Sequence, residues 1–113
     1  MERLSSDDYL LINETFIADH NICSQWFEWV IENLIPVIKA TDLTENIILS
    51  RIIADYNPDG ISYALQFLIK ESDFETFDKD RGIYNVRKSM NEIFKNKIAS
   101  FQTRMLILNS ELK

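Results

Sequence analysis

Residues 22–38, from Ile22 to Ile38, constrain the fold of this chain more than any other segment. Eleven of these seventeen residues are apolar, and both tryptophans of the chain lie among them, three positions apart. The apolar residues recur at the three- and four-residue spacing of an α-helix, which leaves only a narrow polar stripe. Such a helix must be buried on several sides, although Pro36 lacks a backbone donor and is expected to kink or end it near residue 35. We expect these side chains at its buried centre: Trp26, Phe27, Trp29, Val30 and Leu34.

Glycine and proline are scarce, with two of each in 113 residues. Sandwiches and barrels need many tight turns, which these residues usually supply, so their scarcity favours helices joined by short polar connections. Apolar residues make up 46% of the chain and aromatic residues 12%, enough for a buried core. The sequence therefore predicts an all-α fold: a single helical domain over residues 1–113, with about five helices in a compact bundle around the central apolar helix.

Three further helices are predicted from the same apolar spacing. They cover residues 7–18, residues 42–56, which open with the spacing of a capping box, and a long C-terminal segment from residue 83 to about residue 112. The apolar pattern of this last helix is interrupted once, between Ile93 and Ile98, which indicates a stutter or a slight bend.

Residues 61–69 fit two periods, because their apolar side chains alternate as in a strand and also form a helical stripe. We predict a helix, since a lone strand would leave its backbone donors and acceptors unpaired and no second segment is an obvious partner. After it, the capping-box spacing of Ser72 and Glu75 predicts a short helical turn that brings Phe74 and Phe77 inward.

Charge is distributed unevenly along the chain, whose net charge is −6. Residues 1–80 carry sixteen acidic and five basic side chains, a net charge of −11, whereas residues 81–113 carry two acidic and seven basic ones, a net charge of +5. Either the basic end neutralises the acidic body within one molecule, or the acidic surface binds a partner. The sequence leaves both interpretations open.

The densest acidic cluster lies between residues 71 and 80, where five carboxylates fall within ten residues. Their mutual repulsion is tolerated where water or a cationic partner surrounds them. Two acids on the preceding turn extend the cluster. The candidate partner-binding residues are Glu71, Asp73, Glu75, Asp78, Asp80, Asp55 and Asp59.

A small, acidic, helical chain of this kind resembles the immunity proteins that neutralise bacterial nuclease toxins. The resemblance implies an inhibitor of the antitoxin type, which binds a basic protein partner, a toxin or nuclease, through its carboxylates. Nuclease active sites are cationic because their substrate is polyanionic, so fixed carboxylates gain steering and charge-assisted hydrogen bonds there. The alternative is a helical oligomerisation module, or a regulatory or nucleic-acid-associated module, that uses the basic C-terminal helix. The negative net charge argues against nucleic acid.

The common motifs of enzymes and metal sites are missing from the sequence. It contains no phosphate-binding glycine run, no HExxH and no GxSxG, so we predict no enzyme activity, no small-molecule substrate, no cofactor and no metal. His20 and Cys23 lie three apart but supply two of the four ligands of a structural zinc site. Residues 78–89 depart from the spacing of a calcium loop.

The chain has one cysteine and an N-terminus without the pattern of a signal peptide. Its longest apolar stretch is interrupted by acidic residues and falls short of the roughly 20 apolar residues of a membrane span. We therefore expect a cytoplasmic protein.

Overall fold

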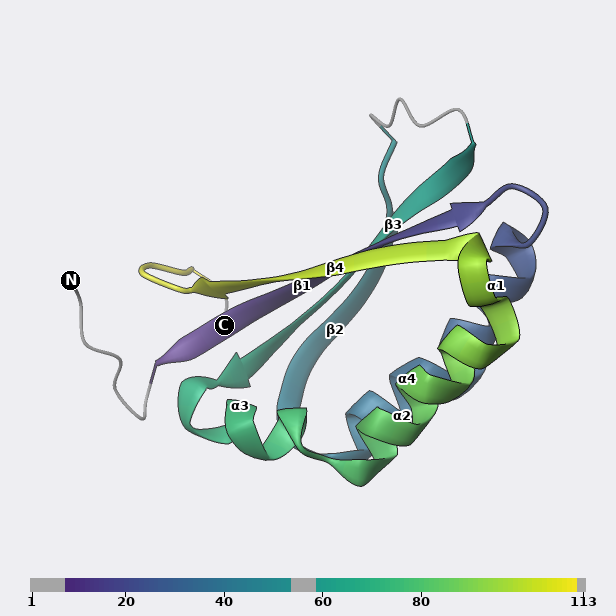
Figure 1. Cartoon of the computed structure of the whole chain (residues 1–113). Helices are drawn as coiled ribbons and strands as arrows, with labels where there is room; N and C mark the ends of the chain where they lie inside the picture. The colour runs from purple at the N-terminus through teal and green to yellow at the C-terminus, as the bar shows by residue number, and fades with distance from the viewer. Residues whose placement is uncertain (1–7, 54–58, 112–113) are drawn as a thin grey trace.

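The computed structural model describes residues 8–53 and 59–111 (Figure 1). In chain order its elements are β1 (Tyr9–Asp19), α1 (Cys23–Trp29), the π-helical turn η1 (Val30–Leu34), α2 (Ile35–Ala40), β2 (Thr44–Arg51), β3 (Gly60–Lys70), α3 (Glu71–Asp78), α4 (Arg81–Phe94), the 3-10 turn η2 (Lys95–Lys97) and β4 (Ile98–Leu106). The strands form one antiparallel sheet in the order β2-β3-β1-β4. Figure 1 shows the helices on one side of this sheet. The fold is therefore α+β, and the predicted all-α bundle of about five helices is wrong.

β1 is a central strand that pairs along its length with β3 and, over most of it, with β4. Its even-numbered side chains from residue 10 to residue 18 are buried, and its odd-numbered ones are half-buried. The predicted helix over residues 7–18 is wrong because Ile12 and Phe16, four apart, fit one helical turn as well as two strand repeats. Two neighbouring strands satisfy the backbone donors and acceptors of β1, which decides between the two periods.

β3 occupies the segment 61–69 that was predicted as a helix, and that prediction is wrong. Its ladder with β1 runs without a break from the pair Tyr9 and Lys70 to the pair Asp19 and Gly60. The alternation of apolar residues was the informative pattern. The sequence offers β3 no obvious partner because both strands that pair with it, β1 and β2, lie in segments predicted as helices.

β2 replaces most of the helix predicted over residues 42–56, and residues 54–56 lie outside the described part of the chain. Asp42 does not cap a helix but sits in the turn before the strand, with φ of 59°. Asn46 has φ of 54°, and the pairing of β2 with β3 shifts register between Glu45 and Ile48. A bulge of this kind twists the strand, and β2 lies at an edge of the sheet.

The central apolar helix is confirmed as the continuous run of α1, η1 and α2 from Cys23 to Ala40. The helix does not end at Pro36. In an α-helix the missing N–H of Pro36 would have donated to the carbonyl of Glu32, and the wider turn η1 lies at that point. No helix in the described residues is both long enough and apolar enough to span a membrane.

The C-terminal third of the chain is helical only in its first half. α4 ends at Phe94, inside the interruption between Ile93 and Ile98, where Lys95 has φ of 46°. The interruption thus marks a change from helix to strand rather than a stutter. Because β4 occupies residues 98–106, the predicted long C-terminal helix is wrong, and so is the helical oligomerisation or nucleic-acid-associated module that would have used it.

The short helix predicted near Ser72 is present as α3, but it begins at Glu71 and its N-cap, Lys70, makes no side-chain cap hydrogen bond, so no capping box forms at Ser72. Phe77 is buried in the core, and its ring centroid lies 5.3 Å from that of Phe67 on β3 and 6.4 Å from that of the partly buried Phe74. These ring contacts anchor α3 beside the end of β3.

The core lies between the sheet and the helices, with Trp26 at its centre. The Trp26 ring lies 4.9 Å from Phe16 of β1 and 4.9 Å from Tyr63 of β3, measured between centroids. Val30 and Leu34 are fully buried, as predicted, whereas Trp29 is only partly buried and Phe27 is 39% exposed. The helix is therefore buried on one broad face rather than on every side.

Replacing Trp26 with alanine should lower the free energy of unfolding by about 3–5 kcal/mol, because it removes a buried ring from contact with both central strands. Phe27→Ala is the matched control, since it truncates a neighbouring aromatic residue that is partly exposed, and it should cost about 1 kcal/mol or less. Urea unfolding followed by circular dichroism measures both. Equal losses would contradict the packing described above.

Candidate functional site

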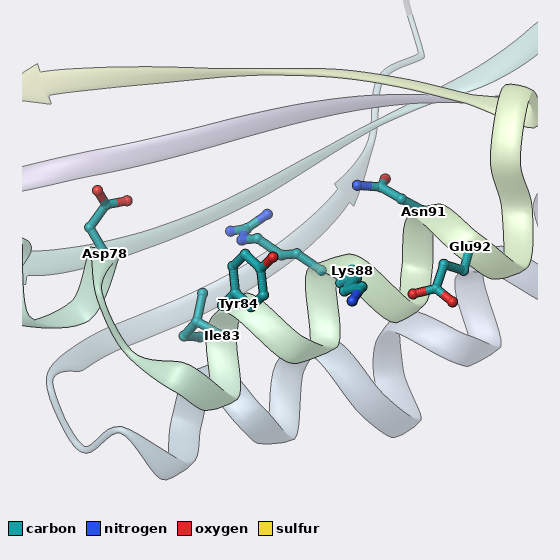
Figure 2. A pocket seen from close by; sticks show the side chains of 7 residues that line it. Asp78, Ile83, Tyr84, Lys88, Asn91 and Glu92 are labelled. Atoms are coloured by element: carbon teal, nitrogen blue, oxygen red, sulfur yellow. The ribbon is translucent and has the colours of Figure 1, made fainter.

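A cleft of about 660 Å³ lies along α4. Figure 2 shows its side chains along the helix, with the strands of the sheet passing above them. Such a volume falls in the range of small-molecule pockets. We call it the α4 cleft, and it is lined by Asp78, Ile83, Tyr84, Arg87, Lys88, Asn91 and Glu92.

Arg87 connects the α4 cleft to a buried ion pair. Its Nη1 lies 2.6 Å from Oε2 of Glu14, which projects from the middle of β1 toward the helices. The side chain of Glu14 is 8% exposed and that of Arg87 is 24% exposed. Glu14 thus lies in the core layer, and Arg87 lies between it and the cleft.

The carboxylate of Glu14 is only half satisfied. Its Oε1 is buried and has no hydrogen-bond partner among the described residues. A buried polar atom without a partner costs about 1–3 kcal/mol, and more when the group is charged. A buried polar atom without a partner requires an explanation, and the neighbouring cleft makes Glu14 a candidate functional residue.

Local structure explains why these two residues meet. Glu14 is an even-numbered residue of β1, so it shares the buried face with Ile12 and Phe16. On α4, Val86 and Met90 are buried, and Arg87 lies at the border of this buried stripe, from which its long side chain reaches the sheet. In the sequence, Glu14 is only one of the sixteen acids of residues 1–80. The available signal was an acid at an inward position of an alternating run.

The opposite face of the sheet carries no helix of the described chain (Figure 1). β1 presents its odd-numbered residues there, and the ladders align them with even-numbered residues of β3 and odd-numbered residues of β4. Phe101 on β4 is 60% exposed. We call this surface the open face, and across its three adjacent strands it comprises Leu11, Asn13, Thr15, Ile17, Ser62, Ala64, Gln66, Leu68, Ala99, Phe101, Thr103 and Met105.

The open face contains no charged residue. Charged side chains make up 27% of the chain, so twelve residues would include about three by chance. The charges begin at the margins, with Asp19 and Lys70 at strand ends and Glu45 on β2. An uncharged sheet face of this extent is typical of a surface that another protein layer covers.

The predicted partner-binding acids are spread over several local structures. Glu71 and Asp73 lie in the first turn of α3, and Asp78 ends this helix and lines the α4 cleft. Asp80 caps α4 by accepting a hydrogen bond from the backbone N–H of Ile83. Acids at these helix N-termini favour the helix dipole, a structural role that needs no partner.

Of the remaining predicted acids, Glu75 lines the same hollow of the surface as Glu71. Glu75 forms an ion pair with Lys79 at 2.7 Å, and this hydrogen bond lowers the pKa of the Glu75 carboxyl and raises the pKa of Lys79. Asp59 lies just before β3, and Asp55 falls outside the described residues. A binding role for the seven acids stays a prediction.

The hydrogen bond between Cys23 and His20 involves the backbone of His20. The thiol of Cys23 donates to the carbonyl oxygen of His20, at 3.4 Å. The pKa of the Tyr63 phenol is raised, chiefly by burial and then by the neighbouring Cys23. In the described ranges, no three His, Cys, Asp or Glu side chains are grouped so that they could hold a metal ion.

Solved structures with the same fold were found at low sequence identity. A dimeric ferredoxin-like protein from an uncultured marine organism has a TM-score of 0.69 at 8% identity, over 91% of this chain and 98% of that one. SnoaB, a cofactor-independent oxygenase from Streptomyces nogalater, has a TM-score of 0.68 at 10% identity, over 95% and 99%. A proposed antibiotic biosynthesis monooxygenase from Caulobacter crescentus has a TM-score of 0.63 at 9% identity, over 87% and 90%. At these identities the likeness shows the fold alone, which is ferredoxin-like.

These neighbours correct the function predicted from charge. They are dimeric ferredoxin-like proteins and oxygenases, so the predicted immunity or antitoxin-type inhibitor is wrong, and nothing in them supports a basic toxin or nuclease as partner. The oxygenases also weaken the prediction that the chain is not an enzyme. Net charge reports on solubility and association, and an acidic surface is compatible with many folds.

Comparison with curated proteins finds no match. A family model does match, over residues 9–108, which run from the start of β1 to just beyond the end of β4. The match therefore includes both the α4 cleft with its Glu14–Arg87 pair and the whole open face. The chain belongs to the family described as domain of unknown function DUF4286.

Proposed function

We propose that the chain works as a homodimer that acts on a small molecule. In this proposal the open faces of two copies pack against each other, and the α4 cleft of each copy, on the opposite side of its sheet, takes the small molecule. The observation that carries the proposal is the absence of charge from the open face. A dimeric neighbour supports the assembly, and an oxygenase neighbour supports the small-molecule role.

The composition of the open face suits a second copy of the same chain. A two-fold symmetric interface brings the same surface of both copies together, so each residue must tolerate its own kind nearby. An uncharged surface meets this condition, whereas a surface of one sign would repel itself. A partner of opposite charge has no feature to recognise on this face.

The open face supplies part of the area of a standard dimer interface. Its three strands, about 4.8 Å apart, and nine residues that rise about 3.3 Å each make an outline of roughly 14 Å by 30 Å. A standard interface buries about 800 Å² on each partner, so side chains that project from the sheet and the adjoining edge strand β2 must contribute the rest of the contact. Covering it also removes Phe101 and Met105 from water.

A polar row crosses the middle of the otherwise mostly apolar and small surface. Asn13 on β1 pairs with Gln66 on β3 and with Thr103 on β4, and its side-chain amide donates to the hydroxyl of Thr15, at 3.2 Å. Polar groups inside an interface need partners, which they find only in one alignment of the two copies. A single polar residue at a buried position of a coiled coil fixes register in this way, at some loss of stability.

Phe101→Glu should convert the dimer into monomers. A charge buried without a partner costs several kcal/mol, and about 1.4 kcal/mol is a factor of ten in affinity, so the dissociation constant should rise at least about a hundredfold. Sedimentation velocity over a range of concentrations measures it. Ile93→Glu on α4 is the matched control, because Ile93 is 56% exposed but lies on the helix side, and it should leave the dimer intact. A monomeric wild-type chain, or dissociation by Ile93→Glu alone, would refute the proposed interface.

Replacing Asn13 and Thr103 together with valine should keep the dimer but remove the constraint on its register. The apolar row strengthens association while permitting more than one alignment of the two sheets. Backbone amide spectra by NMR should show extra or broadened signals from β1 and β4, whereas the wild-type chain should give one set. If the variant gives one sharp set of signals and the same affinity, the polar row has no role in register.

A further inference from the structure

We infer that a hollow between α3 and the end of β4 binds a small zwitterion with an apolar side chain, of the class of the apolar α-amino acids. The hollow has a volume of about 460 Å³, and Leu10, from the buried face of β1, places it on the helix side of the sheet. The inference therefore depends neither on the open face nor on the α4 cleft. We call this site the α3 hollow, and its lining includes Leu10, Glu71, Phe74, Glu75, Arg104 and Leu106.

Arg104 provides a cation that is held in place. Its guanidinium carbon lies 4.2 Å from the centroid of the Phe74 ring, and its Nε donates to Oε1 of Gln102, at 3.0 Å. The ring contact and the bond to Nε together fix the plane of the guanidinium. The N–H groups of its two terminal nitrogens have no partner within the described residues. This edge of a guanidinium matches the two oxygens of a carboxylate.

Glu71 provides an anion that faces the same space without meeting Arg104. Across residues 8–53 and 59–111, no ion pair joins its carboxylate to Arg104 or to another cation. Glu75 differs, because its carboxylate is paired with Lys79. A ligand that carries both charges can satisfy the two groups together, with its carboxylate at Arg104 and its ammonium at Glu71. A ligand with a single charge would satisfy one group and meet a like charge at the other.

The sheet keeps these two charged residues apart. Glu71 directly follows β3, Arg104 lies on β4, and β1 runs between the two strands. Two strand spacings amount to about 10 Å, which leaves room for a small molecule between the two side chains. The ammonium and the carboxylate of an α-amino acid are attached to one carbon atom, so a single molecule of this class can contact both sides of the hollow.

Apolar side chains form much of the remaining lining. Leu10 and Leu106 lie opposite each other in the ladder between β1 and β4, and the partly buried ring of Phe74 lines the hollow with them. Apolar ligand atoms that cover these side chains remove further apolar surface from water. Apolar walls with a few placed polar groups are the usual composition of a small-molecule site. The ligand should therefore carry an apolar side chain.

The test is titration of the purified full chain with L-phenylalanine, followed by NMR of its backbone amides. A ligand of this size should bind with a dissociation constant of about 1 mM, a range that amide shifts can follow. Two matched probes keep the ring and lack one charge each: 2-phenylethylamine has no carboxylate, and 3-phenylpropionate has no ammonium. Each should bind at least about tenfold more weakly, because each leaves one charged group of the hollow without a partner. The shifted amides should lie in α3 and at the end of β4.

Two variants assign the ligand charges to their partners. Arg104→Met should remove the preference for L-phenylalanine over 2-phenylethylamine, and Glu71→Gln should remove the preference over 3-phenylpropionate. Both should bind L-phenylalanine at least about tenfold more weakly, with circular dichroism confirming an unchanged fold. The matched controls are Arg81→Met and Glu45→Gln, which remove exposed charges outside the α3 hollow and should bind as the wild-type chain does.

Equal affinity of the wild-type chain for L-phenylalanine and for either probe would overturn the inference, since the hollow would then recognise one charge only. A preference that survives in the matching variant would overturn it too, because the ligand group would lie elsewhere. If L-phenylalanine shifts the amides of α4 instead of those of α3 and β4, the inference fails while the small-molecule role of the α4 cleft gains support. The absence of any shift at tenfold the expected dissociation constant would likewise refute the inference and leave the proposed dimer untouched.

Discussion

Burial of the even-numbered side chains of β1 against the helices is the interaction on which the rest of the structure depends. β1 pairs with β3 on one side and with β4 on the other, so its alignment decides which side chains of all three strands meet Trp26 and its neighbours. A slip by one residue would move the whole apolar set to the other face, and Glu14 with it. The core, the ion pair beside the α4 cleft and the uncharged open face therefore follow from one register.

The two faces of the sheet differ in where they place charged side chains. On the helix side, burying Glu14 lowers the stability of the fold. An apolar residue of similar size would leave no unpaired Oε1 and would not require Arg87 as an ion-pair partner. On the other side, a chain rich in charge places none where three strands lie side by side. Both features work against the stability or solubility of an isolated monomer, and the proposed dimer accounts for the second of them.

The helices could be predicted from the sequence, and the strands could not. Apolar side chains recur at helical spacing over most of residues 22–38, which predicts a helix there. The helix continues past Pro36, where a kink or an end is expected, because a wider turn accommodates the missing donor. In β1, Ile12 and Phe16 fit both periods, and only pairing with strands far away in sequence decides between them. The same ambiguity concealed the site. Glu14 is recognised as an inward-facing acid only once residues 9–19 are known to form a strand. The density of charge along the chain instead pointed to the acids of α3, of which Asp78 alone lines the α4 cleft.

The central claim is that a second copy of the chain covers the open face. Its most direct test is an isotope-filtered NOE measurement on dimers mixed from labelled and unlabelled chains, which detects only contacts between copies. The account predicts such contacts among the methyl groups of Leu11, Leu68 and Met105, and none from Ile93 on the helix side of the sheet. Contacts between copies through α4, or no contacts from the open face at concentrations where the chain sediments as a dimer, would contradict it.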